Sequence, residues 1–298
     1  MRIFPFRRWQ RLKYKTQKKL APIIFIGPFL INFLIFMVYP ILYSFVLSFC
    51  KYRGGHTTFV NIKNYAYLFT EPTFYQSLFN TLIIFIIQVP IMTILALILG
   101  NLLNSALIKL KGFFRMVTFM PVLIDSVSYT IVFSLLFSEN GGFINNVLQM
   151  CGGSAQKWFS SGPFAMAMII IALTWRWTGY NSIIMLSGLQ NIPEELYEAA
   201  SIDGANAFVK FWKITIPQLK PVIIFSVFNS INGTLQLFTE PQLLTSGGPA
   251  NSTLTVVLYL YKMGFKNFNF GVASAGSYIL AIIVALITLL QFRITKEE

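Results

Sequence analysis

Six long apolar stretches alternate with shorter polar segments along the chain. They fall at about 22–49, 77–104, 114–138, 163–189, 221–243 and 269–292. Each is near or above the roughly 20 residues that a helix needs to cross about 30 Å of hydrocarbon. A transmembrane β-barrel would instead show segments of about 10 residues with alternating hydrophobicity. The pattern predicts an all-α, polytopic membrane protein, with six transmembrane helices in residues 22–298.

Composition supports this prediction. Of the 298 residues, 55% are hydrophobic and only 11% are charged, which is too apolar for a water-soluble domain of this size. The first apolar stretch is too long for a cleaved signal peptide and has no small-residue cleavage site, so we expect it to stay as a membrane anchor.

Basic residues predict how the chain is oriented. Residues 1–21 form a basic tail without acidic residues, and the loop at 105–115 is also basic. The basic residues of these two segments are Arg2, Arg7, Arg8, Arg11, Lys13, Lys15, Lys18, Lys19, Lys109, Lys111 and Arg115. The positive-inside rule places both segments in the cytoplasm, and an even number of spans then places the C-terminus there too. The net charge of +13 does not indicate nucleic-acid binding, because eight of the 23 basic residues lie in one tail beside a membrane span, where contact with the lipid bilayer explains them.

A polar segment at 190–220 separates the fourth and fifth apolar stretches. Pro193 suits the first turn of a helix, and the acidic residues after it favour the positive end of the helix dipole. Gly204 predicts a left-handed stop, and Asn206 can cap a second short helix. Pro217 and Pro221 are expected to limit how far that helix runs. The segment therefore predicts a compact helix–turn–helix at the cytoplasmic surface.

The residues of this segment resemble the EAA loop of ABC importer permeases. The matching positions are Glu198-Ala199-Ala200, Gly204, Ile214 and Pro217. Two other segments, 61–69 and 244–254, resemble signatures of the carbohydrate branch of these permeases, which imports maltose and other oligosaccharides. The resemblance covers nearly the whole chain and implies a type I ABC importer fold.

That resemblance implies partners and coupling residues. The chain has no Gly-Lys dipeptide, so it lacks the phosphate-binding loop of an ATPase. ATP and Mg are therefore expected in two separate cytoplasmic ATP-binding subunits, with no cofactor in this chain, which is not itself an enzyme. A second permease and an extracellular solute-binding protein are expected as well. The implied coupling residues are Glu198, Ala199, Ala200, Asp203, Gly204 and Phe208. The alternative is an ordinary interfacial amphipathic hairpin.

Polar side chains in the fourth and fifth stretches are candidates for a solute path. Aromatic and amide groups together suit sugars, because rings pack on C–H faces and amides bond hydroxyls. The candidates are Trp177, Tyr180, Asn181, Asn229, Asn232 and Gln236, and Glu240 continues the spacing of the last three along one helix face. The alternative is that these side chains connect helices to each other or to a second permease.

Two charged residues lie near the middle of neighbouring predicted spans. A lone charge there is costly, so Asp125 and Arg176 are predicted to form an intramembrane pair, with a direct solute contact as the alternative. The sequence thus predicts a permease subunit of an importer for a carbohydrate. The rival functions are a permease for another polar solute of the same superfamily, an ATP-independent secondary transporter, and a membrane scaffold.

Overall fold

The computed structural model describes residues 14–53, 56–105 and 108–296. Most of the predicted basic tail, residues 1–13, lies outside the described residues, whereas residues 14–21 already belong to the first helix. The predominantly helical class is confirmed, with a small two-stranded hairpin in addition.

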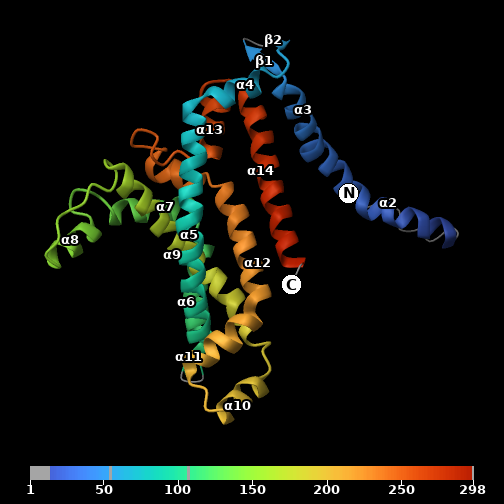
Figure 1. Ribbon diagram of the computed structural model, residues 1–298. Helices are drawn as coiled ribbons and strands as arrows, with labels where there is room; N and C mark the ends of the chain where they lie inside the picture. Colours follow the sequence, from blue (N-terminus) through green and yellow to red (C-terminus); the bar gives the residue numbers. More distant parts are fainter. Residues whose placement is uncertain (1–13, 54–55, 106–107, 297–298) are drawn as a thin grey trace, which may run out of the picture.

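The elements follow one another along the chain as shown in Figure 1. In the first half they are α2 (Tyr14–Phe33), the π-helical turn η1 (Leu34–Val38), α3 (Tyr39–Ser48), β1 (Cys50–Arg53), β2 (His56–Phe59), α4 (Lys63–Thr70), α5 (Pro72–Asn104), α6 (Lys111–Leu123), α7 (Ser126–Leu136) and α8 (Phe143–Met150). In the second half they are α9 (Gly162–Leu189), α10 (Glu194–Ile202), α11 (Ala207–Lys210), η2 (Phe211–Thr215), α12 (Ile216–Leu235), η3 (Pro241–Thr245), α13 (Val256–Tyr261), η4 (Lys262–Lys266) and α14 (Phe270–Lys296).

Four of the described helices are long and apolar enough to cross a membrane. They are Leu20–Ser48, Pro72–Asn104, Ala207–Leu235 and Phe270–Gln291. The bent pair α6 and α7 raises the number to five if it counts as one span. The fourth predicted stretch forms α9, which has 28 residues and carries several polar side chains. The structure is consistent with the six predicted spans without reproducing all of them as straight apolar helices.

The third predicted span is broken, which the hydropathy pattern did not show. α6 and α7 meet at an angle of 95°. Between them, Ile124 and Asp125 have extended backbones, with ψ of 133° and 143°. The Asp125 carboxylate accepts the N–H groups of Val127 at 2.9 Å and Ser128 at 3.3 Å. An aspartate in this position caps the N-terminus of a helix, so α7 begins anew at the bend.

The fifth predicted span is also different from the expectation. The helix that Asn206 caps runs through Pro217 and Pro221 without stopping, passing from α11 into η2 and α12. The π-helical turn of η2 accommodates Pro217. Its hydrogen bonds differ from the usual α-helical pattern just before this proline, which has no N–H group to donate. The helix then ends at Leu235, well before residue 243, where the apolar stretch ends.

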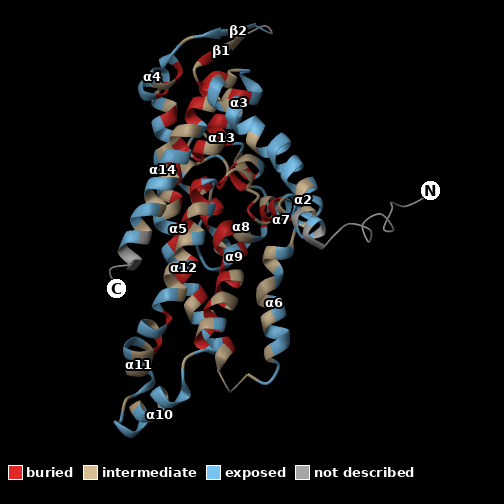
Figure 2. Ribbon diagram, turned by 90° about the vertical axis from the view of Figure 1, so that its right-hand side faces the viewer, coloured by how far each residue is buried: buried red, intermediate tan, exposed pale blue. Residues whose placement is uncertain are grey.

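α5, α9 and α12 form the centre of the molecule (Figure 2). α9 lies so close to α6 that a Cβ atom at Gly179 would overlap the carbonyl oxygen of Thr118. One buried cluster lies around α7 and α9, and a second joins α13, α14 and the start of α5. α3 packs on α14, whereas α2 extends away from the other helices, with its apolar side chains exposed (Figure 1).

The two ends of the molecule differ in what they carry. α10, α11, the end of α5 and the start of α6 lie at one end, and the β1–β2 hairpin and α4 lie at the other (Figure 1). The start of α6 and segment 190–220, which the sequence assigns to the cytoplasm, are therefore at the same end of the molecule. Cys50 is buried, Cys151 is exposed, and both are free thiols.

Candidate functional site

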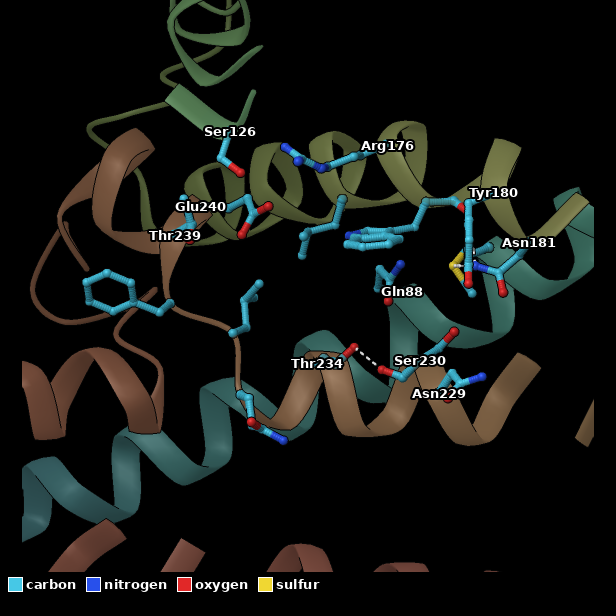
Figure 3. Close-up of a pocket in the computed structure, with 17 residues that line it drawn as sticks. Gln88, Ser126, Arg176, Tyr180, Asn181, Asn229, Ser230, Thr234, Thr239 and Glu240 are labelled. Atoms are coloured by element: carbon cyan, nitrogen blue, oxygen red, sulfur yellow. Dashed lines mark hydrogen bonds between the residues drawn. The ribbon is translucent and has the colours of Figure 1, made fainter. Parts of the chain in front are cut away.

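A cavity of about 280 Å³ lies between α5, α9, α12 and the segment that follows α12. Five of the six predicted path residues line it, and Figure 3 shows amide and aromatic side chains around it. Those five are Trp177, Tyr180, Asn181, Asn229 and Gln236. Residues about 50 positions apart in the chain are thus brought to one pocket, although whether they bind solute stays a prediction.

Asn232 is the predicted residue that does not line this pocket. Its amide donates to the carbonyl of Phe228 at 3.0 Å within α12. The lining positions of α12 are Asn229, Ser230, Gly233 and Thr234. At about 100° per residue, Asn232 lies some 60° from Asn229 on the side away from the other three. The three-residue spacing from Asn229 therefore pointed to a residue on the side of α12 that faces away from the pocket.

The predicted polar stripe also assumed one continuous helix up to Glu240, which is wrong. α12 ends at Leu235, so Gln236 is its C-cap and the next residues are not helical. Glu240 precedes the first turn of η3. Both side chains nevertheless line the pocket, because the chain bends around it.

Asn181 has bonding partners within the protein. It is buried, its oxygen accepts the hydroxyl of Ser226 on α12 at 2.5 Å, and its nitrogen donates to the carbonyl of Trp177 at 3.0 Å. Trp177 and Tyr180 instead keep part of their rings open to the pocket and form an edge-to-face pair with centroids 5.9 Å apart. Asn181 thus connects α9 to α12, while the two rings form an apolar wall.

The predicted ion pair between Asp125 and Arg176 does not form. Asp125 is occupied as the cap of α7, and Arg176 places its guanidinium carbon 4.4 Å from the ring centroid of Tyr129. The reason is the bend of the third span, which puts Asp125 at a helix terminus rather than in the middle of a straight helix. Asp125 therefore has backbone partners that the sequence pattern did not reveal.

Tyr129 connects Arg176 to Glu240, and the sequence did not identify it. Its hydroxyl donates to Glu240 Oε1 at 2.5 Å, and the ring is almost fully buried. Arg176 is 9% exposed, and its Nε and Nη1 have no hydrogen-bond partner. Arg176 and Glu240 both reach the same end of the pocket, beside Ser126 (Figure 3). The sequence did show an arginine and a glutamate within otherwise apolar stretches. It contained no sign that a tyrosine side chain lies between them.

At the far end of α12, the predicted helix–turn–helix is present. α10 begins at Glu194, with Pro193 as its N-cap rather than in its first turn as predicted. Gly204 has a φ of +77°, in the region that L-residues avoid. The N–H of Ala205 bonds to the carbonyl of Ala200 at 2.9 Å, and that of Gly204 to Ser201 at 3.1 Å. These two bonds form a Schellman motif, so the predicted left-handed stop is confirmed.

The second helix of the hairpin begins where the sequence predicted. Asn206 Oδ1 accepts the N–H of Val209 at 2.9 Å and caps α11. The hydroxyls of Tyr197 and Thr215 are 2.9 Å apart, and Lys210 Nζ donates to Ser201 Oγ at 2.6 Å. These two contacts, which the sequence did not predict, fasten α10 to the beginning of the α12 helix.

The outer face of this hairpin is open to solvent. Glu198, Ala199, Asp203, Gly204 and Phe208 are exposed, and Ala200 is half-buried. Ile202 and Phe208 expose 87% and 72% of their surface. Apolar side chains and carboxylates thus project together from the end of the molecule, in an arrangement that suits a protein interface.

The fold matches that of two solved structures. The structure resembles a chain of a bacterial alginate ABC transporter, solved with its alginate pentasaccharide-bound periplasmic protein, with a TM-score of 0.83 and 21% identity over 95% of this chain and 97% of that one. A second alginate importer structure gives a TM-score of 0.82, with 95% of this chain and 99% of that chain covered. These similarities establish the fold.

The chain belongs to the family of binding-protein-dependent transport system inner membrane components, whose model matches residues 65–296. It is 44% identical to the lactose transport system permease protein LacF of Rhizobium radiobacter over 92% of this chain and 94% of that protein. It is 38% identical to the arabinooligosaccharides transport system permease protein AraP of Bacillus subtilis (strain 168), over 96% and 91% respectively. The chain is therefore a multi-pass membrane protein and a transport component.

Proposed function

We propose that this chain is a permease subunit of an ATP-driven, binding-protein-dependent importer for a carbohydrate, and that an oligosaccharide is its solute. Relatives at 44% and 38% identity are named for lactose and arabinooligosaccharides. The pocket combines the two groups that sugars need: the rings of Trp177 and Tyr180, and the amides of Asn229 and Gln236. Aromatic faces pack on sugar C–H groups, and amides can both donate and accept for hydroxyls.

One observation supports coupling between ATP hydrolysis and the pocket. The helix from Ala207 to Leu235 is continuous, with the exposed hairpin at its start and the pocket at its end. At about 1.5 Å per residue its 29 residues span roughly 43 Å. A displacement of α10 passes through the Tyr197–Thr215 and Lys210–Ser201 bonds to this helix. The helix then moves Asn229 relative to α9 and changes access to the pocket.

The partners follow from this mechanism. Two cytoplasmic ATP-binding subunits hold ATP and Mg and receive the hairpin, with Glu198 paired to a basic group and Gly204 allowing close approach. A second permease supplies the opposite wall of the path and covers apolar surface such as that of α2, which has no buried residue among those described. An external solute-binding protein delivers the sugar. The alginate transporter, which was solved in complex with its pentasaccharide-bound periplasmic protein, is the precedent for this partner.

Orientation is part of the same proposal. The hairpin and the start of α6 occupy one end of the molecule, and this end faces the cytoplasm. The positive-inside rule assigns both chain termini to the same side of the membrane. The β1–β2 hairpin and α4 lie at the opposite end and face outward (Figure 1).

The test is co-expression of the chain with its partner subunits, followed by purification and sugar uptake in proteoliposomes. We expect Glu198→Ala to reduce both recovery of the ATPase and ATP-driven uptake by about tenfold or more, because truncating one side of a desolvated charge pair typically costs roughly 2–5 kcal/mol. Glu194→Ala is the matched control, since Glu194 is an exposed acid on the same helix outside the matched motif. Wild-type uptake and ATPase recovery in Glu198→Ala would refute the coupling role, and no uptake of any sugar by the wild type would refute the solute class.

A further inference from the structure

The end of the pocket nearest η3 contains two opposite charges that are not hydrogen-bonded to each other. Arg176 is more than nine-tenths buried, and its Nε and Nη1 lack any partner. Glu240 is 6% exposed, and the structure gives its carboxylate one hydrogen bond, from Tyr129 to Oε1. Both residues line the cavity, and both contact the same tyrosine.

Unpaired donors on a buried guanidinium are costly unless something bonds to them. Tyr129 leaves Nε and Nη1 unpaired, since the guanidinium lies against its ring and its hydroxyl donates to Glu240. The face of a ring attracts the cation but accepts no in-plane hydrogen bond. Nε and Nη1 are covered by protein and unsatisfied, and Arg176 lines the pocket, so a turn of its side chain would present them to an acceptor that enters; Glu240 lies at the same end (Figure 3).

We propose that Arg176 and Glu240 form a hydroxyl-binding pair that selects a neutral sugar with adjacent hydroxyl groups and excludes acidic sugars. This inference rests on the proposed function and specifies its substrate class. Each sugar hydroxyl can accept one hydrogen bond and donate another. One hydroxyl accepts from Arg176, and its neighbour donates to Glu240.

Charge balance gives the selectivity. The two residues carry one positive and one negative charge, so a neutral sugar leaves the pocket neutral. A carboxylate on the sugar adds a second buried negative charge beside Glu240, and a like charge in a site of low dielectric is strongly unfavourable. Tyr129 positions Glu240 by occupying Oε1, which leaves Oε2 for the solute.

The test measures sugar binding to the permease without the binding protein, which has its own selectivity. Ser230 lines the pocket and is replaced by Cys in a Cys50→Ala/Cys151→Ala background, within the complete complex of permeases and ATPases. A water-soluble maleimide labels the new thiol. The concentration of sugar that halves the labelling rate is the readout for lactose, maltose and arabinobiose. It is also determined for lactose and maltose oxidised at C6 of the non-reducing ring to the carboxylate, and for monodeoxy analogues of the most protective sugar.

We expect neutral sugars to protect at concentrations about tenfold or more below those of their carboxylates, since hydrogen bonds to charged groups are among the stronger ones. Arg176→Gln and Glu240→Gln should each raise the protective concentration of the neutral sugar by about tenfold. Removal of one particular hydroxyl should weaken protection in the wild type by a similar factor, and by less than about twofold in the two variants. A merely structural role would not make the variants insensitive to one hydroxyl.

Several results would overturn the inference. Equal protection by neutral and carboxylated sugars would contradict the selectivity and needs no pocket variant beyond Ser230→Cys. If every deoxy analogue lost the same factor in wild type and variants, the pair would not bind hydroxyls, while the carbohydrate importer would stand. If Arg176→Gln fails to assemble, Arg176→Lys and Glu240→Asp give the same comparison. If no sugar protects, the inference falls, and the separate uptake assay decides whether the proposed function falls with it.

Discussion

The pocket and the coupling hairpin lie on the same long helix yet satisfy their polar groups in opposite ways. At the pocket, Asn181, Tyr129 and Glu240 are buried and bonded mainly to other helices of the chain. At the hairpin, Glu198 and Asp203 project into solvent, and internal bonds hold only the side that faces α11. The pocket thus depends on this chain's own packing, whereas in the proposed importer the hairpin is completed by a partner. Substitutions in the two regions should therefore fail in different assays.

Two glycines sharpen this comparison most. A Cβ at Gly179 would overlap the Thr118 carbonyl oxygen, so Gly179→Ala forces α6 and α9 apart. We expect a loss of about 2–3 kcal/mol or more in stability of the membrane domain. A Cβ at Gly204 would meet no atom within 4 Å, so Gly204→Ala carries only the left-handed strain of about 1 kcal/mol. Thermal unfolding of the purified complex measures both.

The Gly204 variant should instead lose ATPase during purification, because its backbone strain distorts the surface proposed to bind that subunit. Gly233→Ala is a control, since its Cβ also meets open space and its φ is ordinary. Equal melting temperatures for the Gly179 and Gly204 variants would contradict the distinction between the two regions.

Two asparagines provide a smaller and matched pair. Asn181→Ala leaves the Ser226 hydroxyl without its acceptor in a buried position, which costs about 1–3 kcal/mol. Asn206→Ala removes the cap of α11 and costs about 1 kcal/mol locally. Hydrogen exchange should show faster opening across α9 and α12 for the first variant, and only at residues 204–212 for the second.

Two further variants are the controls for the asparagine substitutions. Asn206→Asp keeps a capping oxygen and should restore protection of α11. Asn181→Ala combined with Ser226→Ala should cost less than the sum of the two, since the bond is lost only once. Additive costs would show that Asn181 does not connect α9 and α12.

Asp125 tests whether the bent third span depends on a charge pair or on a helix cap. We expect Asp125→Ala to cost about 1 kcal/mol and Asp125→Asn much less, because asparagine caps as well as aspartate. The Asn variant should add independently to Arg176→Gln, since the two side chains form no ion pair. Thermal unfolding of the single and double variants gives the answer, and strong coupling between them would restore the ion pair that the sequence suggested.

The smallest expected effect concerns the segment between α7 and α9. Glu139 accepts the N–H groups of Phe159 and Ser160, and these bonds hold the pKa of its carboxyl below its usual range. A lowered pKa means that this carboxylate stabilises the fold above its unfolded-state pKa, and that the stabilisation is lost as the pH falls through the lowered value. Hydrogen exchange at 157–161 should therefore accelerate at acidic pH in the wild type. Glu139→Gln should show fast exchange at neutral pH and little further change on acidification.

Much of the fold could be predicted because a membrane helix must be apolar over its length. The end of α5 at Asn104, the start of α14 within one residue of the prediction, and the Gly204 stop follow from local residue types that act within a few positions. Most of the predicted pocket residues could also be identified from the sequence, because amides in an apolar stretch must face protein or water.

The breaks could not be predicted in this way. A hydropathy value is an average over many residues, so it does not reveal that two residues within an apolar window, Ile124 and Asp125, are extended. Pro217 and Pro221 looked like stops, but tertiary packing and a π-helical turn carry the helix through them. The Tyr129–Glu240 bond joins residues 111 positions apart, and a single sequence contains no local signal for it.

Two interruptions of transmembrane helices face the same cavity, one at the start of α7 and one after α12. Gln236, Leu237 and Phe238 line it, beside Ser126 at the first turn of α7, so backbone groups outside a helical hydrogen-bond ladder lie at the pocket wall. Non-helical backbone at membrane depth is tolerated only where protein buries it or a wet cavity surrounds it. We therefore expect ordered water in the pocket whenever it holds no sugar. Entry of the solute would then replace bound water molecules by sugar hydroxyl groups. The sugar would bind to a hydrated pocket wall and not to a dry one.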